Sequence, residues 1–380
     1  MQFTSKLPDL PTTIFTIMSR LAHKHNAINL SQGFPNFDPD PVLIDLVADA
    51  MKSGYNQYAP MQGTYTLREA ISEKISSLYG HVYDPEYEIT VTAGATQAIY
   101  TIISTFIHKD DEVIILKPAY DCYEPAINAN KGIPVFVQLE GDDFKINWEV
   151  LKQKINAKTK MLIINTPHNP SGSVLGKDDM KKLAALLKGT NIILLSDEVY
   201  EHIVFDEQLH SSASKYPDLA ERTFVCASFG KTFHVTGWKI GYCVAPKTLM
   251  HEFRKVHQFN VFCVDHPKQK ALTTYLKSPK NYQSLNLFYQ YKRDVFLQAM
   301  AGSRFKFTPS KGTFFQLMDY TNITNEADTI FAERLVKEVG VAAIPVSVFN
   351  MDNQDNKVLR FCFAKKDETL EQAAEILCKI

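Results

Sequence analysis

The feature that most constrains the fold is a series of short apolar runs that alternate with helical stretches between residues 88 and 228. Helical patterns separate most of the runs, for example at 96–107, 122–130 and 177–187. Continuous apolar strands that alternate with helices are typical of a mainly parallel sheet covered on both faces. The runs are EITVT from Glu88, EVIIL from Glu112, VFVQL from Val135, KMLIIN from Lys160, NIILLS from Asn191 and TFVCAS from Thr223.

A seventh run, KIGYCVA at 239–245, follows the sixth without a helix between them, which predicts an antiparallel member of the sheet. Helical patterns then continue from about 248 to 300, with breaks at Pro267 and Pro279. The tail repeats strand-like and helix-like runs, which predict a smaller α/β layer. The sequence therefore predicts an α/β fold with a seven-stranded, mainly parallel sheet and a second, smaller unit.

The composition is that of an ordinary globular chain, with 45% hydrophobic and 22% charged residues. The net charge is −1 and the basic residues are scattered, so we expect neither nucleic acid nor a membrane surface as partner. The six cysteines show no CxxC pair and no zinc-like spacing, which favours a reducing, cytoplasmic setting without a metal. The N-terminus lacks the apolar core of a signal peptide, and the longest uncharged run, 89–107, is too polar for a membrane span.

The carboxyl ends of parallel strands share one edge of the sheet, where ligands bind in such folds, so the residues after each strand are the candidates for a site. Ala95 and Thr96 follow the first run at the start of a helix, where free backbone N–H groups can bind phosphate. Tyr120 follows the second run and Asn169 follows the fourth, in TPHNPSG. Each of these features taken alone has a simpler interpretation: Ala95 and Thr96 as a helix cap, Tyr120 as a core aromatic and Asn169 as a turn residue.

Asp197 follows the fifth run, after five apolar residues and a serine, and is therefore expected to be poorly solvated. A buried carboxylate needs a cation or a strong donor as partner. Tyr200, three residues later, lies on the same side if the turn is helical.

Lys231 follows the sixth run, in SFGKTFHVTGWKIGY, between glycines and small hydroxyl residues that suit a tight turn close to a ligand. A shielded lysine can lose its proton and form a Schiff base with an aldehyde such as pyridoxal phosphate. Ser228 and Lys239, in the same segment, are candidate phosphate donors, and Asp197 is a candidate partner for the cofactor's ring nitrogen. Convergence of five strand ends on one cofactor is much more specific than any single motif.

These motifs resemble the class I aminotransferases of the fold-type-I pyridoxal-phosphate superfamily. The methionine aminotransferase group is the most similar, with the kynurenine–oxoglutarate (glutamine transaminase K) enzymes nearby. The resemblance extends from SQGFPNF at 31–37 to VLRFCFAKK at 358–366, nearly the whole chain. It implies three segments: an N-terminal arm that is part of the small domain (1–37), a large cofactor-binding domain (38–285) and a small C-terminal domain (286–380). The motifs that carry the resemblance are NTPHNPSG, SDEVYEHIVFD, SFGKTFHVTGWKIGY and GVAAIPVSVF.

The resemblance also implies roles for individual residues. Lys231 would form the Schiff base and move the proton, with Asp197 on the ring nitrogen and Tyr120 stacked on the ring. Tyr200 and Asn169 would bond the phenolate oxygen. Ala95, Thr96, Ser228 and Lys239 would hold the phosphate, and Tyr58 would reach the phosphate of a neighbouring subunit in a homodimer. Arg360 would bind the substrate carboxylate, and Gly33 lies on the substrate loop. Many relatives have arginine where this chain has Lys239, so a two-pronged phosphate contact is lost.

The activity implied is transfer of an amino group from an amino acid to a 2-oxo acid by a ping-pong mechanism. No arginine occurs between residues 256 and 292 to bind a side-chain carboxylate, whereas FNVFCV at 259–264 is apolar. With Phe15, Ile14 and Phe349 this run could form an apolar pocket for methionine, glutamine or aromatic donors. A β-lyase acting on cystathionine or cysteine conjugates shares the fold and the lysine, and a non-catalytic cofactor-binding regulator is a further alternative.

Overall fold

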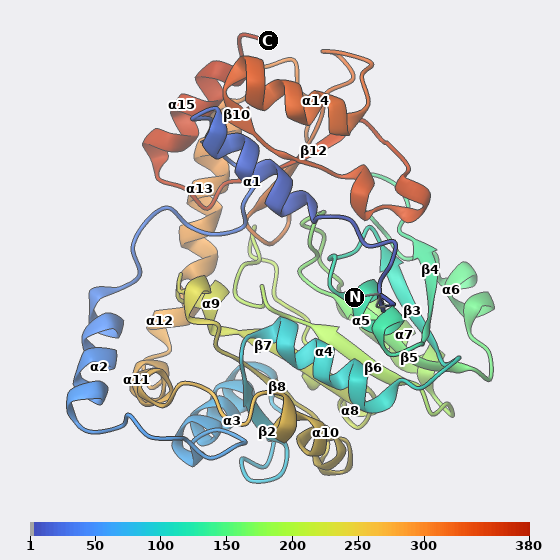
Figure 1. Ribbon diagram of the computed structural model, residues 1–380, viewed down its shortest axis with the longest axis vertical. Coiled ribbons are helices and arrows are strands. Elements are labelled where there is room, and N and C mark those ends of the chain that lie inside the picture. The colour runs from blue at the N-terminus through green and yellow to red at the C-terminus, as the bar shows by residue number, and fades with distance from the viewer. Residues whose placement is uncertain (1–3) are drawn as a thin grey trace.

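The computed structural model describes residues 4–380, so the first three residues of the predicted N-terminal arm lie outside the described part. The chain forms one large sheet, a three-stranded sheet and a two-stranded ladder, all surrounded by helices (Figure 1).

The strands are β1 (Ile28–Asn29), β2 (Ile89–Thr92), β3 (Glu112–Lys117), β4 (Ile133–Gln138), β5 (Thr159–Asn165), β6 (Ile193–Asp197), β7 (Thr223–Ser228), β8 (Gly241–Val244), β9 (Phe315–Asp319), β10 (Val341–Ala342), β11 (Ile344–Pro345) and β12 (Val358–Cys362). The α-helices are α1 (Ile14–Lys24), α2 (Pro41–Lys52), α3 (Tyr65–Tyr79), α4 (Ala95–Phe106), α5 (Tyr123–Ala129), α6 (Trp148–Lys154), α7 (Lys177–Leu187), α8 (Pro217–Ala220), α9 (Phe229–Thr232), α10 (Lys247–Asn260), α11 (His266–Leu276), α12 (Lys280–Gln283), α13 (Leu285–Ala299), α14 (Asp328–Arg334) and α15 (Asp367–Leu377). Short 3₁₀ turns lie at η1 (Ala213–Lys215), η2 (Thr236–Trp238), η4 (Ser347–Phe349) and η5 (Met351–Asn353), and a π-helical turn, η3 (Leu335–Val339), extends α14.

The large sheet has seven strands, as the sequence predicts, and their order is β2-β8-β7-β6-β5-β3-β4. The four pairings among β7, β6, β5, β3 and β4 are all parallel. β8 is antiparallel to both β2 and β7, which confirms the antiparallel seventh run. Because β8 runs the opposite way, the residues before it lie at the edge where the parallel strands end.

Alternate residues of the strands face two separate cores, since side chains of a strand point to opposite faces in turn. On β3, Val113 and Ile115 join the core formed with α4, α5 and α10, whereas Ile114 and Leu116 join the core on the other face. Helices therefore cover both faces, and α4 lies in front of the sheet in Figure 1. The burial of both faces explains why the strands read as continuous apolar runs.

The smaller layer is built from both ends of the chain. β12 pairs antiparallel with β9 and β11, and α13 and α15 pack together beside them. β1, near the N-terminus, pairs in parallel with β10, so that the blue and red segments lie side by side in Figure 1. The boundaries of the predicted domains at 37/38 and 285/286 stay a prediction.

The break that the sequence places at Pro267 falls earlier, at 261–265 between α10 and α11. Pro267 lies in the first turn of α11, where its missing N–H costs no helical hydrogen bond, and Asp265 caps the helix by accepting from the Lys268 N–H. Over residues 4–380, no helix has the length and apolar character needed to span a membrane.

Candidate active site

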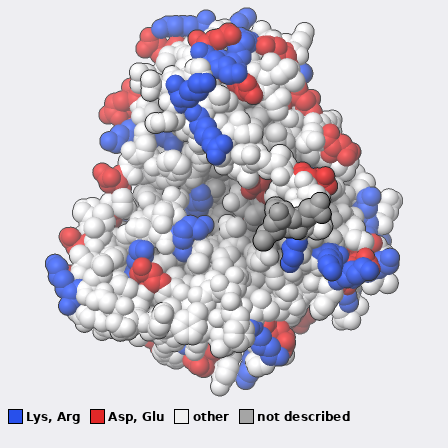
Figure 2. Space-filling model, in the orientation of Figure 1, with Lys and Arg blue, Asp and Glu red and all other residues white. Residues whose placement is uncertain are grey.

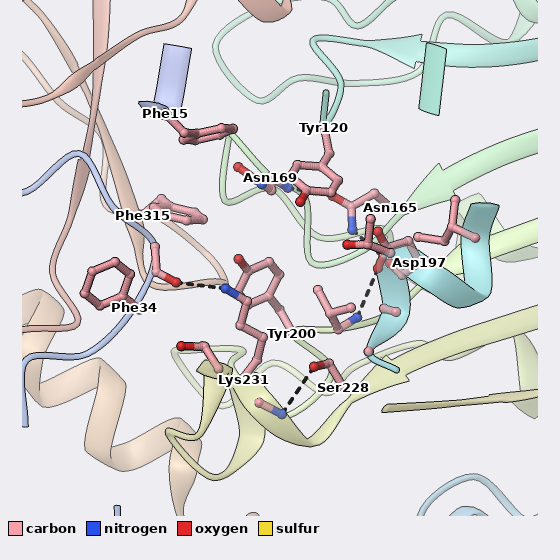
Figure 3. Close-up of a pocket in the computed structure, with 18 of the residues that line it drawn as sticks. Phe15, Phe34, Tyr120, Asn165, Asn169, Asp197, Tyr200, Ser228, Lys231 and Phe315 are labelled. Atoms are coloured by element: carbon pink, nitrogen blue, oxygen red, sulfur yellow. Dashed lines mark hydrogen bonds between the residues drawn. The ribbon is translucent and has the colours of Figure 1, made fainter. Parts of the chain in front are cut away.

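A cavity of about 360 Å³ lies at the edge of the large sheet where the parallel strands end. Figure 2 shows a hollow near the centre of the face that is turned to the viewer, and Figure 3 shows residues that line the cavity. The predicted catalytic, cofactor-binding and substrate-binding residues all line this cavity except Tyr58, whereas Ile14 and Phe349, which were expected to add to an apolar pocket, do not line it. The lining residues are Phe15, Gln32, Gly33, Phe34, Gly94, Ala95, Thr96, Ile99, Tyr120, Asn165, Asn169, Asp197, Val199, Tyr200, Ser228, Gly230, Lys231, Thr236, Lys239, Phe315 and Arg360.

Lys231 lies in α9, the single helical turn that follows β7. The turn begins at Ser228, whose hydroxyl accepts a hydrogen bond from the Gly230 N–H at 3.2 Å. The Lys231 amine donates to the Gly33 carbonyl at 2.8 Å (Figure 3) and lies near the faces of the Tyr200 and Phe314 rings. Burial lowers the pKa of this amine from its ordinary value to about 8. The neutral amine, which is a nucleophile and a base, is therefore more populated near neutral pH than in an ordinary lysine.

Asp197 ends β6 and is 4% exposed. One carboxylate oxygen accepts from the Tyr123 hydroxyl at 2.6 Å, and the other has only a long contact with the Val199 N–H, at 3.4 Å. Burial raises the pKa of Asp197 to about 6. No ion pair between residues 4 and 380 includes this carboxylate. A buried acid with a free oxygen and no cation is suited to a positively charged ligand atom.

Tyr200 leaves the turn after β6 toward the same cavity and packs edge-on against Phe314. Burial raises the pKa of Tyr200 well above its ordinary value, so its hydroxyl stays protonated and can donate. The intervening Glu198 points away from the cavity, where its carboxylate accepts from the Ser196 hydroxyl, the Ala213 N–H and His210. The turn thus presents Asp197 and Tyr200 to the cavity and anchors Glu198 behind them.

The part of the cavity wall at the start of α4 is positive. Ala95 and Thr96 open α4, whose cap is Gly94 with φ 79°, a conformation that suits glycine. Lys239 lies just before β8, and its Nζ would be 3.4 Å from a Cβ placed on Gly94. Ser228 ends β7, the neighbour of β8 in the sheet. Free N–H groups at a helix start, a hydroxyl and an ammonium form a site for a phosphate group.

Arg360, on β12, enters the cavity from the smaller layer and is 1% exposed. It donates to the Asn169 side-chain oxygen at 2.6 Å and to the Ser31 carbonyl at 3.1 Å. Its guanidinium lies over the Phe315 ring, 3.9 Å from the centroid, and Phe15 lies 5.2 Å away. Burial lowers the pKa of Arg360 to about 10, which still leaves the group charged at neutral pH. A buried guanidinium without a carboxylate partner is suited to an anionic ligand group.

Gly33 lies where the 31–34 loop passes Phe315. A Cβ on Gly33 would lie 2.7 Å from the Phe315 ring, so a larger residue would force the ring or the loop to move. Since Phe315 stacks on Arg360, this close approach ties the loop to the position of the arginine.

Tyr58 does not line the cavity of its own chain. Its side chain is 79% exposed and contacts Phe262, with ring centroids 5.1 Å apart. Phe259 and Phe262 are also exposed, at 87% and 49%, and FNVFCV contributes no residue to the cavity. The expectation that this run forms a pocket wall is therefore wrong for the cavity as one chain builds it.

The model of the family "Aminotransferase class I and II" matches residues 25–377. The chain belongs to this aminotransferase family. It is similar to the methionine aminotransferase of Escherichia coli (strain K12), at 47% identity over 98% of this chain and 97% of that one. It is also similar to the kynurenine–oxoglutarate transaminase of Dictyostelium discoideum, at 33% identity over 97% and 94%. The solved structure of YbdL from Escherichia coli, for which a methionine aminotransferase function was identified, covers 100% of both chains with 46% identity and a TM-score of 0.98.

Aminotransferases of this family depend on pyridoxal phosphate, and the cavity fits that cofactor. The positive end at α4 suits its phosphate, and the free oxygen of Asp197 suits a protonated ring nitrogen. Lys231, with its lowered pKa, suits the aldehyde, and Tyr120 provides an aromatic ring at the cavity wall. The predicted fold-type-I architecture and the predicted enzyme class are thereby confirmed.

Several residues of this aminotransferase site escape the sequence-based interpretation. Asn165 is the last residue of β5 and donates to the Asp197 carbonyl at 2.9 Å, so the strand-end argument could have found it. Gln32 and Phe34 flank Gly33 in a loop whose local pattern shows only turns. Phe315 begins a strand of the other sheet, and no local signal brings it to this cavity.

Proposed function

We propose that this aminotransferase takes methionine, glutamine and aromatic amino acids as amino donors and passes the amino group to a 2-oxo acid by a ping-pong mechanism. One observation carries the choice of donor. The cations that line the cavity are Lys231, Lys239 and Arg360. We assign them to the cofactor aldehyde, the cofactor phosphate and the substrate α-carboxylate, which are the same for every donor. The substrate side chain is left with Phe15, Phe34 and Phe315, which favour apolar or aromatic groups over a carboxylate.

When bound, pyridoxal phosphate supplies an aldehyde that condenses with amines and a ring that takes up electrons from the substrate. We assign its phosphate to Ala95, Thr96, Ser228 and Lys239, with Tyr58 of a second subunit as a further donor. Tyr120 would stack on the ring, Tyr200 and Asn169 would bond its phenolate oxygen, and the Asp197 carboxylate would hold a proton at the ring nitrogen.

Lys231 has two tasks in this proposal, as the nucleophile that holds the cofactor and as the base that moves a proton from the substrate Cα. The lowered pKa of its amine supports both tasks, because only the neutral form attacks or accepts a proton. Arg360 binds the substrate α-carboxylate and thereby places the Cα–H bond near the Lys231 amine. The Asn169 oxygen that Arg360 now contacts keeps its guanidinium oriented for this task.

The test of the donor proposal is kcat/KM for methionine, phenylalanine, kynurenine and aspartate with one common 2-oxo acid. We expect aspartate to be at least about 100-fold poorer than methionine, since an unpaired carboxylate in an apolar pocket is strongly disfavoured. An aspartate value above those of both methionine and phenylalanine would refute the pocket assignment and leave the cofactor assignment intact.

The same preparation distinguishes a transaminase from a β-lyase. A lyase releases pyruvate and ammonia from cystathionine without any 2-oxo acid present. We expect this release to be slow compared with transamination of methionine, and release faster than transamination would mean that elimination is the main reaction.

We further propose that the enzyme is a homodimer in which Tyr58 completes the partner's site. Tyr58 and Phe262 are in contact at the surface and Phe259 is also exposed, and exposed apolar groups that gather on a surface commonly mark interfaces. The packing of α1 and β1 against the smaller layer supports the assignment of residues 1–37 to the small domain, beside 38–285 and 286–380. A cytoplasmic location is part of the proposal, supported by the six free cysteines.

Mixing two inactive variants tests the shared site. Lys231→Ala and Tyr58→Ala subunits, each of low activity, should regain activity when they form heterodimers, because one of the two sites then has both residues intact. The measurement is activity against the fraction of heterodimer, separated by different affinity tags. Heterodimers without recovery would mean that Tyr58 serves its own subunit, and mixing Lys231→Ala with itself is the control.

A further inference from the structure

Asp197 is held by a residue that does not line the cavity. Tyr123 is 2% exposed, is the first residue of α5 and donates its hydroxyl to one Asp197 oxygen at 2.6 Å. Its ring packs in the core between α4, α5 and the sheet, 5.9 Å from the Tyr120 ring. The segment that presents Tyr120 to the cavity therefore also supplies the partner of Asp197.

We propose that Tyr123 is a positioning residue for the reaction: its hydroxyl fixes one oxygen of the Asp197 carboxylate and thereby turns the other toward the ring nitrogen of the cofactor. The proposal rests on the proposed role of Asp197. It assigns to Tyr123 a specific task, which is to keep that carboxylate ionised and aimed.

The surroundings of Asp197 explain why it needs such a partner. Burial and the neighbouring Glu198 both favour the protonated, neutral form of the acid. The hydrogen bond from Tyr123 favours the ionised form, and the Val199 N–H adds a weaker bond of 3.4 Å. The charge of Lys231 also favours the ionised form of Asp197, but its amine is directed to the Gly33 carbonyl. Tyr123 is thus the one short side-chain donor to Asp197 within residues 4–380.

The geometry also separates positioning from chemistry. Tyr123 is absent from the cavity wall, so it reaches the cofactor only through Asp197. Burial and the Asp197 charge raise the pKa of the Tyr123 hydroxyl well above its ordinary value, so it remains a donor at all working pH values. Removal of the Tyr123 hydroxyl should therefore affect binding only of ligands that have the ring nitrogen. If Tyr123 had a purely structural role, its removal would affect ligands with and without that nitrogen equally.

Tyr123→Phe in the full chain keeps the packed ring and removes only the donor. The test measures binding of two ligands to the apoprotein: pyridoxal phosphate and its deaza analogue, in which CH replaces the ring nitrogen. We expect the wild type to prefer pyridoxal phosphate, and Tyr123→Phe to lose about tenfold or more of that preference, the size expected for a hydrogen bond to a charged group. Binding of the analogue itself should change little.

Tyr83→Phe is the matched control, because Tyr83 is also buried and its hydroxyl contacts Ser214 at 3.2 Å, away from the cavity. This control should keep the wild-type preference. A fluorotyrosine placed at position 123 keeps the ring and provides a stronger donor, and should keep or enlarge the preference even if Tyr123→Phe folds poorly.

The outcomes separate this inference from the role of Asp197. If Tyr123→Phe keeps the full wild-type preference for pyridoxal phosphate over the deaza analogue, the positioning role is overturned and the Asp197 assignment stands. Equal binding of the two ligands by the wild type would overturn both. An equal loss of affinity for both ligands in Tyr123→Phe would assign Tyr123 a structural role only.

Discussion

Lys231→Ala is expected to lower kcat by about 10³-fold or more, since one substitution removes both the nucleophile and the base. The residues proposed to hold the phosphate, Ala95, Thr96, Ser228 and Lys239, are untouched, so the variant should still bind pyridoxal phosphate. The measurement is kcat with methionine, together with a titration of the apoprotein by the cofactor. Loss of binding in parallel with loss of turnover would point to a folding defect, which circular dichroism would reveal.

Borohydride reduction of the wild-type holoenzyme gives the positive counterpart of this experiment. It should fix the cofactor covalently on the peptide that contains Lys231. Lys239 is the matched control, because it is the other lysine that lines the cavity. Lys239→Gln should still be labelled at Lys231, with weaker cofactor binding from the lost phosphate contact. A label on Lys239 in the wild type would refute the assignment of Lys231.

The sequence identifies the large sheet and the residues at its edge for one physical reason. Strands buried on both faces read as apolar runs, and the carboxyl ends of parallel strands necessarily meet at one edge. Asp197 is the last residue of β6, and Lys231, Tyr120 and Asn169 follow β7, β3 and β5 by a few residues. Their assembly in one cavity is a consequence of topology. Asn165, the last residue of β5, falls under the same rule.

Residues from outside the large sheet are not predictable in this way. Arg360 and Phe315 lie on neighbouring strands of the smaller sheet, and only long-range packing brings them over the edge of the larger one. Without the resemblance, Arg360 would read as a surface arginine in a strand. The run FNVFCV was expected in the cavity wall, and it is not there. An apolar composition indicates that a segment will be buried, but it does not identify the element that covers it. Its phenylalanines are exposed in the single chain, beside Tyr58.

Asp197→Ala is expected to lower the rate of the first half-reaction by about 10²- to 10³-fold or more, because the ring nitrogen loses the negative charge that holds its proton. Asp197→Asn should be nearly as slow, since an amide has the same shape but no charge. The measurement is the single-turnover rate with methionine, followed by the absorbance of the holoenzyme.

Glu198→Gln is the matched control for Asp197. Glu198 is as deeply buried and adjacent in the chain, but its carboxylate contacts Ser196, Ala213 and His210 behind the cavity. Loss of its charge should leave the half-reaction within about tenfold of the wild type, because a charge on that side acts on the ring only at a distance. A near-normal rate in Asp197→Asn would show that the reaction needs the shape of this side chain and not its charge, and the assignment of the proton at the ring nitrogen would then fail.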